Sequence, residues 1–156
     1  MEAIFYIISQ MVGAIAGSLV VRAVLSSVQY VAIQGGATLC AANTMWYQGL
    51  IAETLATFFL VQTVLLTAVD NTTVLAPLAI GFTVLMDIMA VGAISGASMN
   101  PARSFGPNIV ATIFMHDKLA ANFWSYHFIY YLGPVFGALL AVALYKVFFA
   151  KDERIV

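Results

Sequence analysis

Four long apolar runs, separated by shorter polar stretches, dominate the sequence. They cover residues 3–25, 48–69, 75–94 and 123–149, and charged residues are rare within them. A helix needs about 20 consecutive apolar residues to cross the hydrocarbon core of a bilayer. Each of the four runs meets that length, so the pattern predicts four transmembrane helices.

The segments between these runs differ in kind. Residues 26–47 contain Gln, Asn, Thr and a Gly-Gly pair, and are expected to form a long outer loop. Residues 70–73 are expected to form a short turn. Residues 95–114 are a small-residue, polar stretch followed by an apolar run that is only about half long enough to span. This last segment predicts a re-entrant half-helix, which dips into the membrane and returns.

The start of the predicted half-helix combines an asparagine, a proline and an arginine. Asn100 is a preferred N-cap residue and Pro101 suits the first helical position, so a helix should begin here. A helix that begins at membrane depth directs its free N–H groups and positive dipole end into the bilayer centre. Such backbone is tolerated only where protein buries it or a water-filled cavity solvates it, and Arg103 at this depth also indicates a polar pathway. The pattern therefore predicts a channel.

Composition agrees with a membrane setting and excludes several classes of function. The chain is 63% hydrophobic and 8% charged, with a mean hydropathy of +0.99. A net charge of −1 gives no attraction to nucleic acid. Cys40 is the one cysteine, so no intrachain disulfide can form. No serine–histidine–acid grouping, metal-ligand cluster or phosphate-binding loop rises above chance, so we expect neither an enzyme nor a metal or cofactor site.

The first and last apolar runs are similar to each other. Aligning Gly13-Ala14 with Gly137-Ala138 also places Arg22 on Lys146. With two spanning helices and a half-helix between them, the two copies would have opposite orientations, as in transporters built from inverted repeats. The alternative is that any two apolar helices with small residues align this well. Small residues that allow close helix packing recur at Gly13/Gly17, Gly92/Gly96 and Gly133/Gly137.

The stretch Ser-Gly-Ala-Ser-Met-Asn-Pro-Ala-Arg-Ser-Phe-Gly-Pro, residues 95–107, resembles the second signature loop of the aquaporins. The resemblance covers nearly the whole chain and is nearest to the aquaporin-8 and tonoplast-intrinsic branch. It extends to the helices that carry Tyr6, Gln10 and Gly13-Ala14, then Glu53 and Thr57-Phe58, then Asp87-Ile88, and finally Tyr126–Tyr130 and Gly133-Pro134.

The resemblance implies an all-α membrane protein with the aquaporin-like inverted-repeat bundle, here truncated to four transmembrane helices and one re-entrant half-helix. Aquaporins have six spanning helices and two Asn-Pro-Ala half-helices. Residues 1–156 correspond to a single partial aquaporin domain, without the first two helices and the first half-helix. Whether the chain is a fragment or a genuine short form stays open.

The resemblance also assigns roles at the signature loop. The Asn100 amide would donate to passing water, while Pro101 and Ala102 shape the start of the half-helix. Arg103, Ile88 and Ala97 would form the selectivity constriction. Water-specific relatives carry histidine where this chain has Ile88, so a wider, less polar opening that admits ammonia or hydrogen peroxide is implied. Ser104 stands where glycerol-conducting relatives carry aspartate, which argues against glycerol.

An ionisable side chain inside a membrane helix requires a partner. For Glu53 the resemblance implies hydrogen bonds to backbone N–H groups of the re-entrant loop, with Gln10 as a helper. Asp87 either faces the pore or is a satisfied buried carboxyl. His127 is either a gate or an interfacial or core residue.

The sequence is therefore consistent with two functions. The first is a passive channel for water, with ammonia and hydrogen peroxide as further solutes, that excludes protons and ions and assembles as a homotetramer in the lipid bilayer. The alternative is a non-conducting subunit that associates with full-length aquaporins. Basic residues near the C-terminus favour a cytoplasmic tail at 150–156 in a multi-pass integral membrane protein.

Overall fold

The computed structural model describes residues 2–69 and 73–149, and within these ranges all regular structure is helical. Four helices are long and apolar enough to cross a membrane: α1, α3 with its continuation to Val69, α4 and α6. The helices, in chain order, are α1 Glu2–Val24, α2 Ser27–Ala32, α3 Trp46–Val64, a π-helical continuation Leu65–Val69, α4 Ala76–Ser95, α5 Pro101–Met115 and α6 Ile129–Phe148. Short 3₁₀ turns cover Gln34–Gly36 and His116–Lys118.

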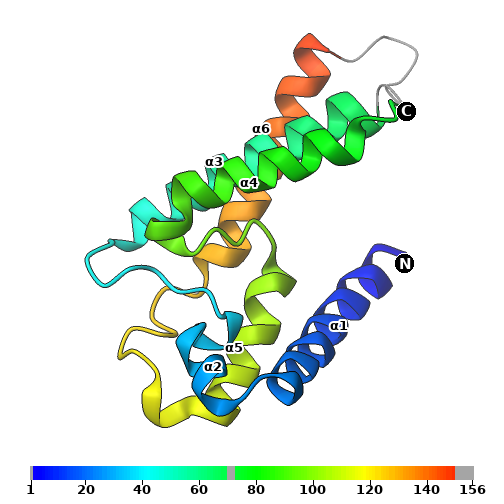
Figure 1. Ribbon diagram of the computed structural model, residues 1–156. Coiled ribbons are helices and arrows are strands. Elements are labelled where there is room, and N and C mark those ends of the chain that lie inside the picture. The colour runs from blue at the N-terminus through cyan, green and yellow to red at the C-terminus, as the bar shows by residue number, and fades with distance from the viewer. Residues whose placement is uncertain (1, 70–72, 150–156) are drawn as a thin grey trace.

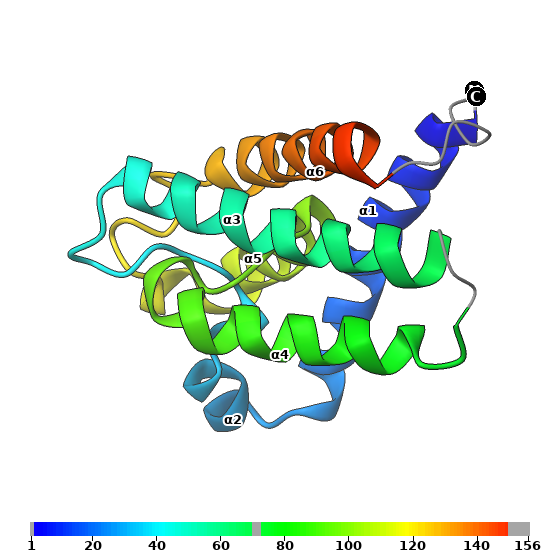
Figure 2. The same ribbon diagram turned by 90° about the horizontal axis from the view of Figure 1, so that it is seen from above.

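The helices form two groups that meet at the segment between α4 and α5. Helix α3 lies between α4 and α6 and packs against both, as both views show (Figures 1 and 2). The main partner of α1 is instead α5, the short helix that follows the signature loop (Figure 1). The half-length helix is therefore the element through which the first spanning helix joins the fold.

Close approach of helix backbones requires glycine at three contacts. A Cβ atom at Gly137 of α6 would lie 2.4 Å from the Thr54 carbonyl oxygen of α3, and one at Gly133 would lie 2.6 Å from the Glu53 Cβ. On α5, a Cβ atom at Gly106 would lie 2.4 Å from the Ala14 carbonyl carbon of α1. The small-residue spacing Gly133/Gly137 is thus used for packing. Its counterpart Gly13/Gly17 has no neighbour within 4 Å.

Two segments differ from the sequence-based expectation. The expected outer loop 26–47 contains α2, because Ser26 and Gln29 form a reciprocal capping box and Tyr30 is buried. The helix expected from residue 123 begins only at Ile129. Residues 120–128 form successive turns with hydrogen bonds between residues three apart, so this apolar stretch is not α-helical. The expected tail, 150–156, and most of the turn at 70–73 lie outside the described residues.

The interior around the signature loop contains many polar side chains beside the apolar Ala56, Ala97 and Met99. Polar side chains that are at most 4% exposed there belong to Thr38, Glu53, Ser95, Ser98, Ser104 and Asn108. In contrast, large apolar side chains are exposed along the outer faces of α1, α4 and α6, where Phe5, Met89 and Leu139 are 61–79% exposed. A centre that contains polar groups within an apolar exterior suits a protein whose exterior contacts lipid.

Candidate functional site

The loop between α4 and α5 turns the chain through an unusual backbone conformation. Gly96, Ala97 and Met99 have positive φ values of 86°, 49° and 55°. Only glycine adopts this region without penalty, so Ala97 and Met99 each cost on the order of 1 kcal/mol or more. Such a loop persists only where neighbouring groups fix it in place.

Glu53 of α3 is the group that fixes this loop. Its carboxylate is fully buried and accepts three hydrogen bonds. Oε1 accepts from the Ser98 N–H at 2.9 Å and the Ser95 hydroxyl at 2.6 Å, and Oε2 accepts from the Met99 N–H at 2.7 Å. The backbone hydrogen bonds that the resemblance implied for Glu53 are therefore present. They bridge the two strained positions, and they satisfy a carboxyl that would otherwise be costly to bury.

Helix α6 adds a second tie to the same loop. The Tyr130 hydroxyl, 1% exposed, donates to the Ser95 carbonyl at 2.5 Å. Ser95 is thus held by α3 through its side chain and by α6 through its backbone. The end of α4 cannot move without breaking contacts to both helices.

Asn100 begins α5 as the sequence predicted. Its Oδ1 accepts from the backbone N–H groups of Ala102 at 2.9 Å and Arg103 at 3.4 Å, and Pro101 occupies the first helical position. The Asn100 side chain is exposed, and its amide Nδ2 donates to no other described residue. Cap, amide and helix dipole together present a positive, hydrogen-bond-donating surface at the start of α5.

Arg103 lies on the first turn of α5 and contacts the outer segment. Its Nη1 donates to the Gly36 carbonyl oxygen at 2.9 Å. Gln34, Gly35 and Gly36 all have positive φ values, of 52°, 64° and 74°, so this carbonyl belongs to a left-handed turn. This acceptor could not be predicted from the sequence. The Gly-Gly pair marked the turn, but a backbone carbonyl has no side-chain signature.

Ile88 and Ala97, the other two residues proposed for the constriction, differ in exposure. Ile88 of α4 is 49% exposed. Ala97 is 2% exposed and packs with Ala56 and Met99, so its side chain faces the protein interior. Asp87, next to Ile88, is 6% exposed, and its Oδ2 forms no hydrogen bond with any described residue. Of these three side chains, Ile88 alone is exposed.

Gln10 is not brought to Glu53. It is exposed on α1, which packs against α5, whereas Glu53 faces α6 and the signature loop from α3. The hydrogen bonds of Glu53 come instead from Ser95, Ser98 and Met99. The expected helper is thus replaced by groups of the loop and of the helix that precedes it.

His127 is buried beside the last helix. Its ring lies 4.5 Å from the Trp124 ring and 5.5 Å from the Tyr130 ring, measured between centroids, and its Nδ1 lies 3.4 Å from Asn108 Nδ2. Burial lowers the pKa of His127, because a charged imidazolium would lose its hydration. The neutral ring can accept from Asn108, so His127 is a core residue in this structure.

We expect acid to destabilise the protein through His127. In the unfolded chain His127 binds its proton with a pKa near 6.5, above the pKa in the folded protein. The contribution of His127 to the free energy of unfolding is therefore constant at higher pH and decreases below about pH 6.5. The loss should be at most about 1.4 kcal/mol per pH unit. Thermal unfolding in detergent between pH 7.5 and 5 should show a steeper loss for the wild type than for His127→Gln. Equal slopes for wild type and His127→Gln would contradict the assignment.

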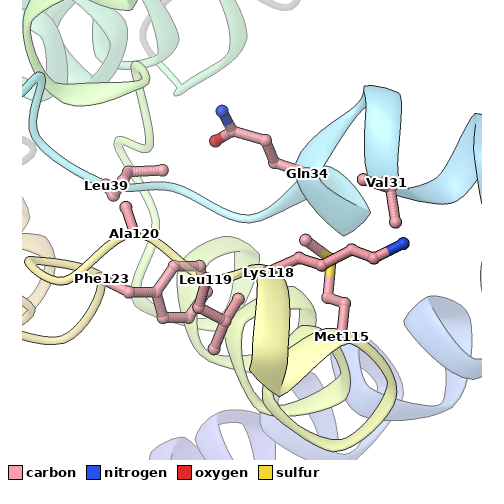
Figure 3. A pocket seen from close by; sticks show the side chains of 8 residues that line it. All are labelled: Val31, Gln34, Leu39, Met115, Lys118, Leu119, Ala120 and Phe123. Atoms are coloured by element: carbon pink, nitrogen blue, oxygen red, sulfur yellow. The ribbon is translucent and has the colours of Figure 1, made fainter.

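A cavity of about 260 Å³ lies between the outer segment and the end of α5 (Figure 3). Its walls are mostly apolar, with the polar ends of Gln34 and Lys118 at its edge. None of Asn100, Arg103 or Ile88 lines it. It is therefore separate from the candidate site. Among the described residues, no cluster of His, Cys, Asp or Glu could hold a metal ion.

Comparison with known proteins gives one consistent result. The sequence profile of the family described as Major intrinsic protein matches residues 1–145. The chain is 37% identical to the probable aquaporin TIP1-2 of Oryza sativa subsp. japonica over 152 residues, which cover 95% of this chain and 54% of that protein. It is 34% identical to aquaporin-8 of Rattus norvegicus over 151 residues, which cover 95% of this chain and 54% of that protein. It is 37% identical to aquaporin AqpM of Methanothermobacter marburgensis over 148 residues, which cover 93% of this chain and 58% of that protein.

These matches agree with the features found in the chain itself. The chain spans about half the length of the curated relatives it matches. That half contains the four membrane-spanning helices, the strained loop held by Glu53, and the short helix that Asn100 begins. The chain is a multi-pass integral membrane protein of the major intrinsic protein family.

Proposed function

We propose that this chain forms part of a passive membrane channel for water, with ammonia and hydrogen peroxide as further neutral solutes. The observation that carries the proposal is the loop that Glu53 fixes, which aims the start of α5 and the Asn100 amide at an exposed face. An amide donor and a helix dipole at one point orient water molecules through their oxygen atoms. Oriented in this way, water cannot relay protons, and the positive end disfavours cations.

The solute range rests on Ile88 and Ser104. The exposed, apolar Ile88 offers no hydrogen bond that would favour water over ammonia or hydrogen peroxide. Ser104 is fully buried and its hydroxyl bonds to Ser98 and Thr38, so it offers no polar group to a polyol. The constriction proposed here is therefore formed by Arg103 and Ile88, with the backbone of the loop at Ala97 beside them.

The proposed setting is a lipid bilayer with the C-terminus in the cytoplasm. As partners we propose further copies in a homotetramer, or full-length aquaporins with which this chain associates. The outer faces of α1 and α6 support such contacts, because Phe5 and Leu139 are more than 60% exposed. Side chains of this kind are stable against lipid or another apolar helix.

The first test measures water flux directly. Liposomes that contain the 156-residue chain are shrunk osmotically in a stopped-flow instrument and compared with empty liposomes. Flux faster than bare lipid, with low temperature dependence, is the result expected for a pore. Two results together would contradict a conducting role: flux equal to bare lipid for the chain alone, and no flux beyond that of a conducting full-length relative when both are reconstituted together.

Ammonia permeation should depend on Ile88. Replacing Ile88 with histidine adds a polar ring at the exposed side of α4, and is expected to reduce ammonia flux more than water flux. Met89→His is the matched control, because Met89 is the next residue, is 79% exposed and has no assigned role. Both fluxes are measured in the same liposomes, ammonia by an internal pH dye. An unchanged ammonia-to-water ratio in Ile88→His would contradict the role of Ile88.

The second candidate function is that of a non-conducting subunit that modulates full-length channels. One observation favours it: Ile88 and Arg103 are exposed in this chain rather than enclosed on all sides. Co-reconstitution distinguishes the two functions. A modulating subunit lowers or raises the flux of its partner without conducting alone.

A further inference from the structure

Besides the Arg103–Gly36 contact, the outer segment is attached to α5 by three hydrogen bonds at Thr38. The Thr38 N–H donates to Asn108 Oδ1 at 3.0 Å, and Asn108 Nδ2 donates back to the Thr38 carbonyl oxygen at 2.9 Å. The Thr38 hydroxyl donates to the Ser104 hydroxyl oxygen at 2.5 Å. We call Thr38, Ser104 and Asn108 the Thr38 clamp. All three are at most 1% exposed, so water does not compete for these bonds.

The clamp lies two residues after the carbonyl that receives Arg103. Gln34, Gly35 and Gly36 form the left-handed turn, whose own backbone bonds are the Gly36 N–H to the Ile33 carbonyl and the Ala37 N–H to the Gln34 carbonyl. Glycine has wide conformational freedom, so a turn of this kind does not by itself fix the direction of its carbonyl groups. The anchor that follows it at Thr38 must contribute that constraint.

The contacts form a closed ring. Arg103 and Asn108 both belong to α5, Arg103 reaches Gly36, and Asn108 reaches Thr38. A rigid helix therefore holds both ends of the short chain Gly36–Thr38. If either the Arg103–Gly36 or the Asn108–Thr38 contact is lost, the ring opens. The segment Gly36–Thr38 is then held by the remaining contact alone and can move more freely.

We propose that Asn108 is a positioning residue for Arg103: it fixes the backbone at Thr38 and thereby places the Gly36 carbonyl that orients the guanidinium. This inference rests on the proposed function, because its consequence is the size of the opening at Arg103. A guanidinium bonded to a carbonyl has a fixed direction, whereas a free one samples several. Asn108 then affects which solutes pass, although its own side chain does not contact them.

The test compares Asn108→Leu with Thr112→Val. Leucine has nearly the shape of asparagine and removes both hydrogen bonds to Thr38. Thr112 lies one turn later on α5, where its hydroxyl donates to the Asn108 backbone carbonyl and accepts from Trp124. Its substitution disturbs the same region but leaves the bonds between the Asn108 side chain and Thr38 in place. The full chain is labelled with ¹⁵N-arginine in nanodiscs, and the Arg103 signal is assigned by its loss in Arg103→Lys.

The first readout is the NMR signal of the Arg103 guanidinium. In the wild type and in Thr112→Val, slow rotation should give separate Nη signals. In Asn108→Leu they should merge, as for an unbonded guanidinium. This readout needs no conduction, so it tests the inference even if the chain proves not to be a channel. Separate Nη signals in a folded Asn108→Leu protein would overturn the proposal.

The second readout is the ratio of glycerol to water permeability in liposomes. A freed Arg103 should raise this ratio by about tenfold, the factor that corresponds to about 1.4 kcal/mol. A merely structural defect would lower both permeabilities together, and that result with unchanged Nη signals contradicts positioning.

Asn108→Asp serves if Asn108→Leu does not fold. It retains an acceptor for the Thr38 N–H but turns a second oxygen, in place of a donor, toward the Thr38 carbonyl. Arg103 mobility is expected to increase in this variant as well, and an immobile Arg103 would contradict the proposal.

Discussion

Replacing Glu53 with leucine is expected to destabilise the fold by at least about 3 kcal/mol. The substitution removes the acceptor of three buried donors, and each buried donor left without a partner costs about 1–3 kcal/mol. It also releases the loop in which Ala97 and Met99 have positive φ values, so the start of α5 loses its fixed direction. Water flux through any pore that uses Asn100 should fall to the level of bare lipid.

The measurement is thermal unfolding in detergent, followed by tryptophan fluorescence. Thr57→Val is the matched control, because Thr57 lies one turn later on α3, is 3% exposed, and its hydroxyl has no partner among the described residues. That control should be nearly neutral. Glu53→Gln keeps acceptor capacity and is expected to lie between the two. Equal stability of Glu53→Leu and Thr57→Val would show that the loop does not depend on Glu53.

Replacing Gly106 with valine is expected to separate α1 from α5. A Cβ atom at this position would lie 2.4–2.7 Å from the carbonyl carbon, carbonyl oxygen and Cβ of Ala14. Two of these atoms belong to the α1 backbone, which cannot rotate away as a side chain could. Overpacking of this kind costs about 1–3 kcal/mol, and α1 can avoid the cost by moving away into lipid.

Spin labels report this separation as a distance. They are placed at Val12 of α1 and Phe114 of α5, both exposed, in a Cys40→Ser background. Gly106→Val should lengthen and broaden the distance distribution. Gly17→Val on α1 should leave it unchanged, since no atom lies within 4 Å of a Cβ there. An unchanged distribution in Gly106→Val would mean that α1 and α5 adapt to the larger side chain.

The apolar pattern was sufficient to predict the spanning helices, because the length and composition of a membrane helix follow from the thickness of the bilayer. It overestimated α6, which begins at Ile129, because the aromatic residues just before the helix were counted with its apolar run. It overlooked α2, although Ser26 and Gln29 formed a readable capping box.

The site was predictable to the extent that side-chain chemistry defines it. Asn100, Arg103 and Glu53 could be found because polar residues in an apolar chain require a reason. The Gly36 carbonyl and the Thr38 clamp could not be found, since their role comes from backbone direction and from contacts between residues about 70 positions apart. The prediction that Gln10 assists Glu53 was wrong, because the apolar pattern does not show that α1 packs against α5 rather than beside Glu53.

The packing of α1 against α5 has a consequence for biosynthesis. Helix α1 ends at Val24, whereas its main partner begins at Pro101 and is completed only at Met115. While α2 to α4 are synthesised and inserted, α1 therefore lacks the helix against which it mainly packs. Most of its exposed side chains, among them Ile4, Phe5 and Val12, are apolar, so lipid can cover them during this delay. Assembly of the two groups of helices then becomes a late step, which begins only after the ribosome has passed the signature loop.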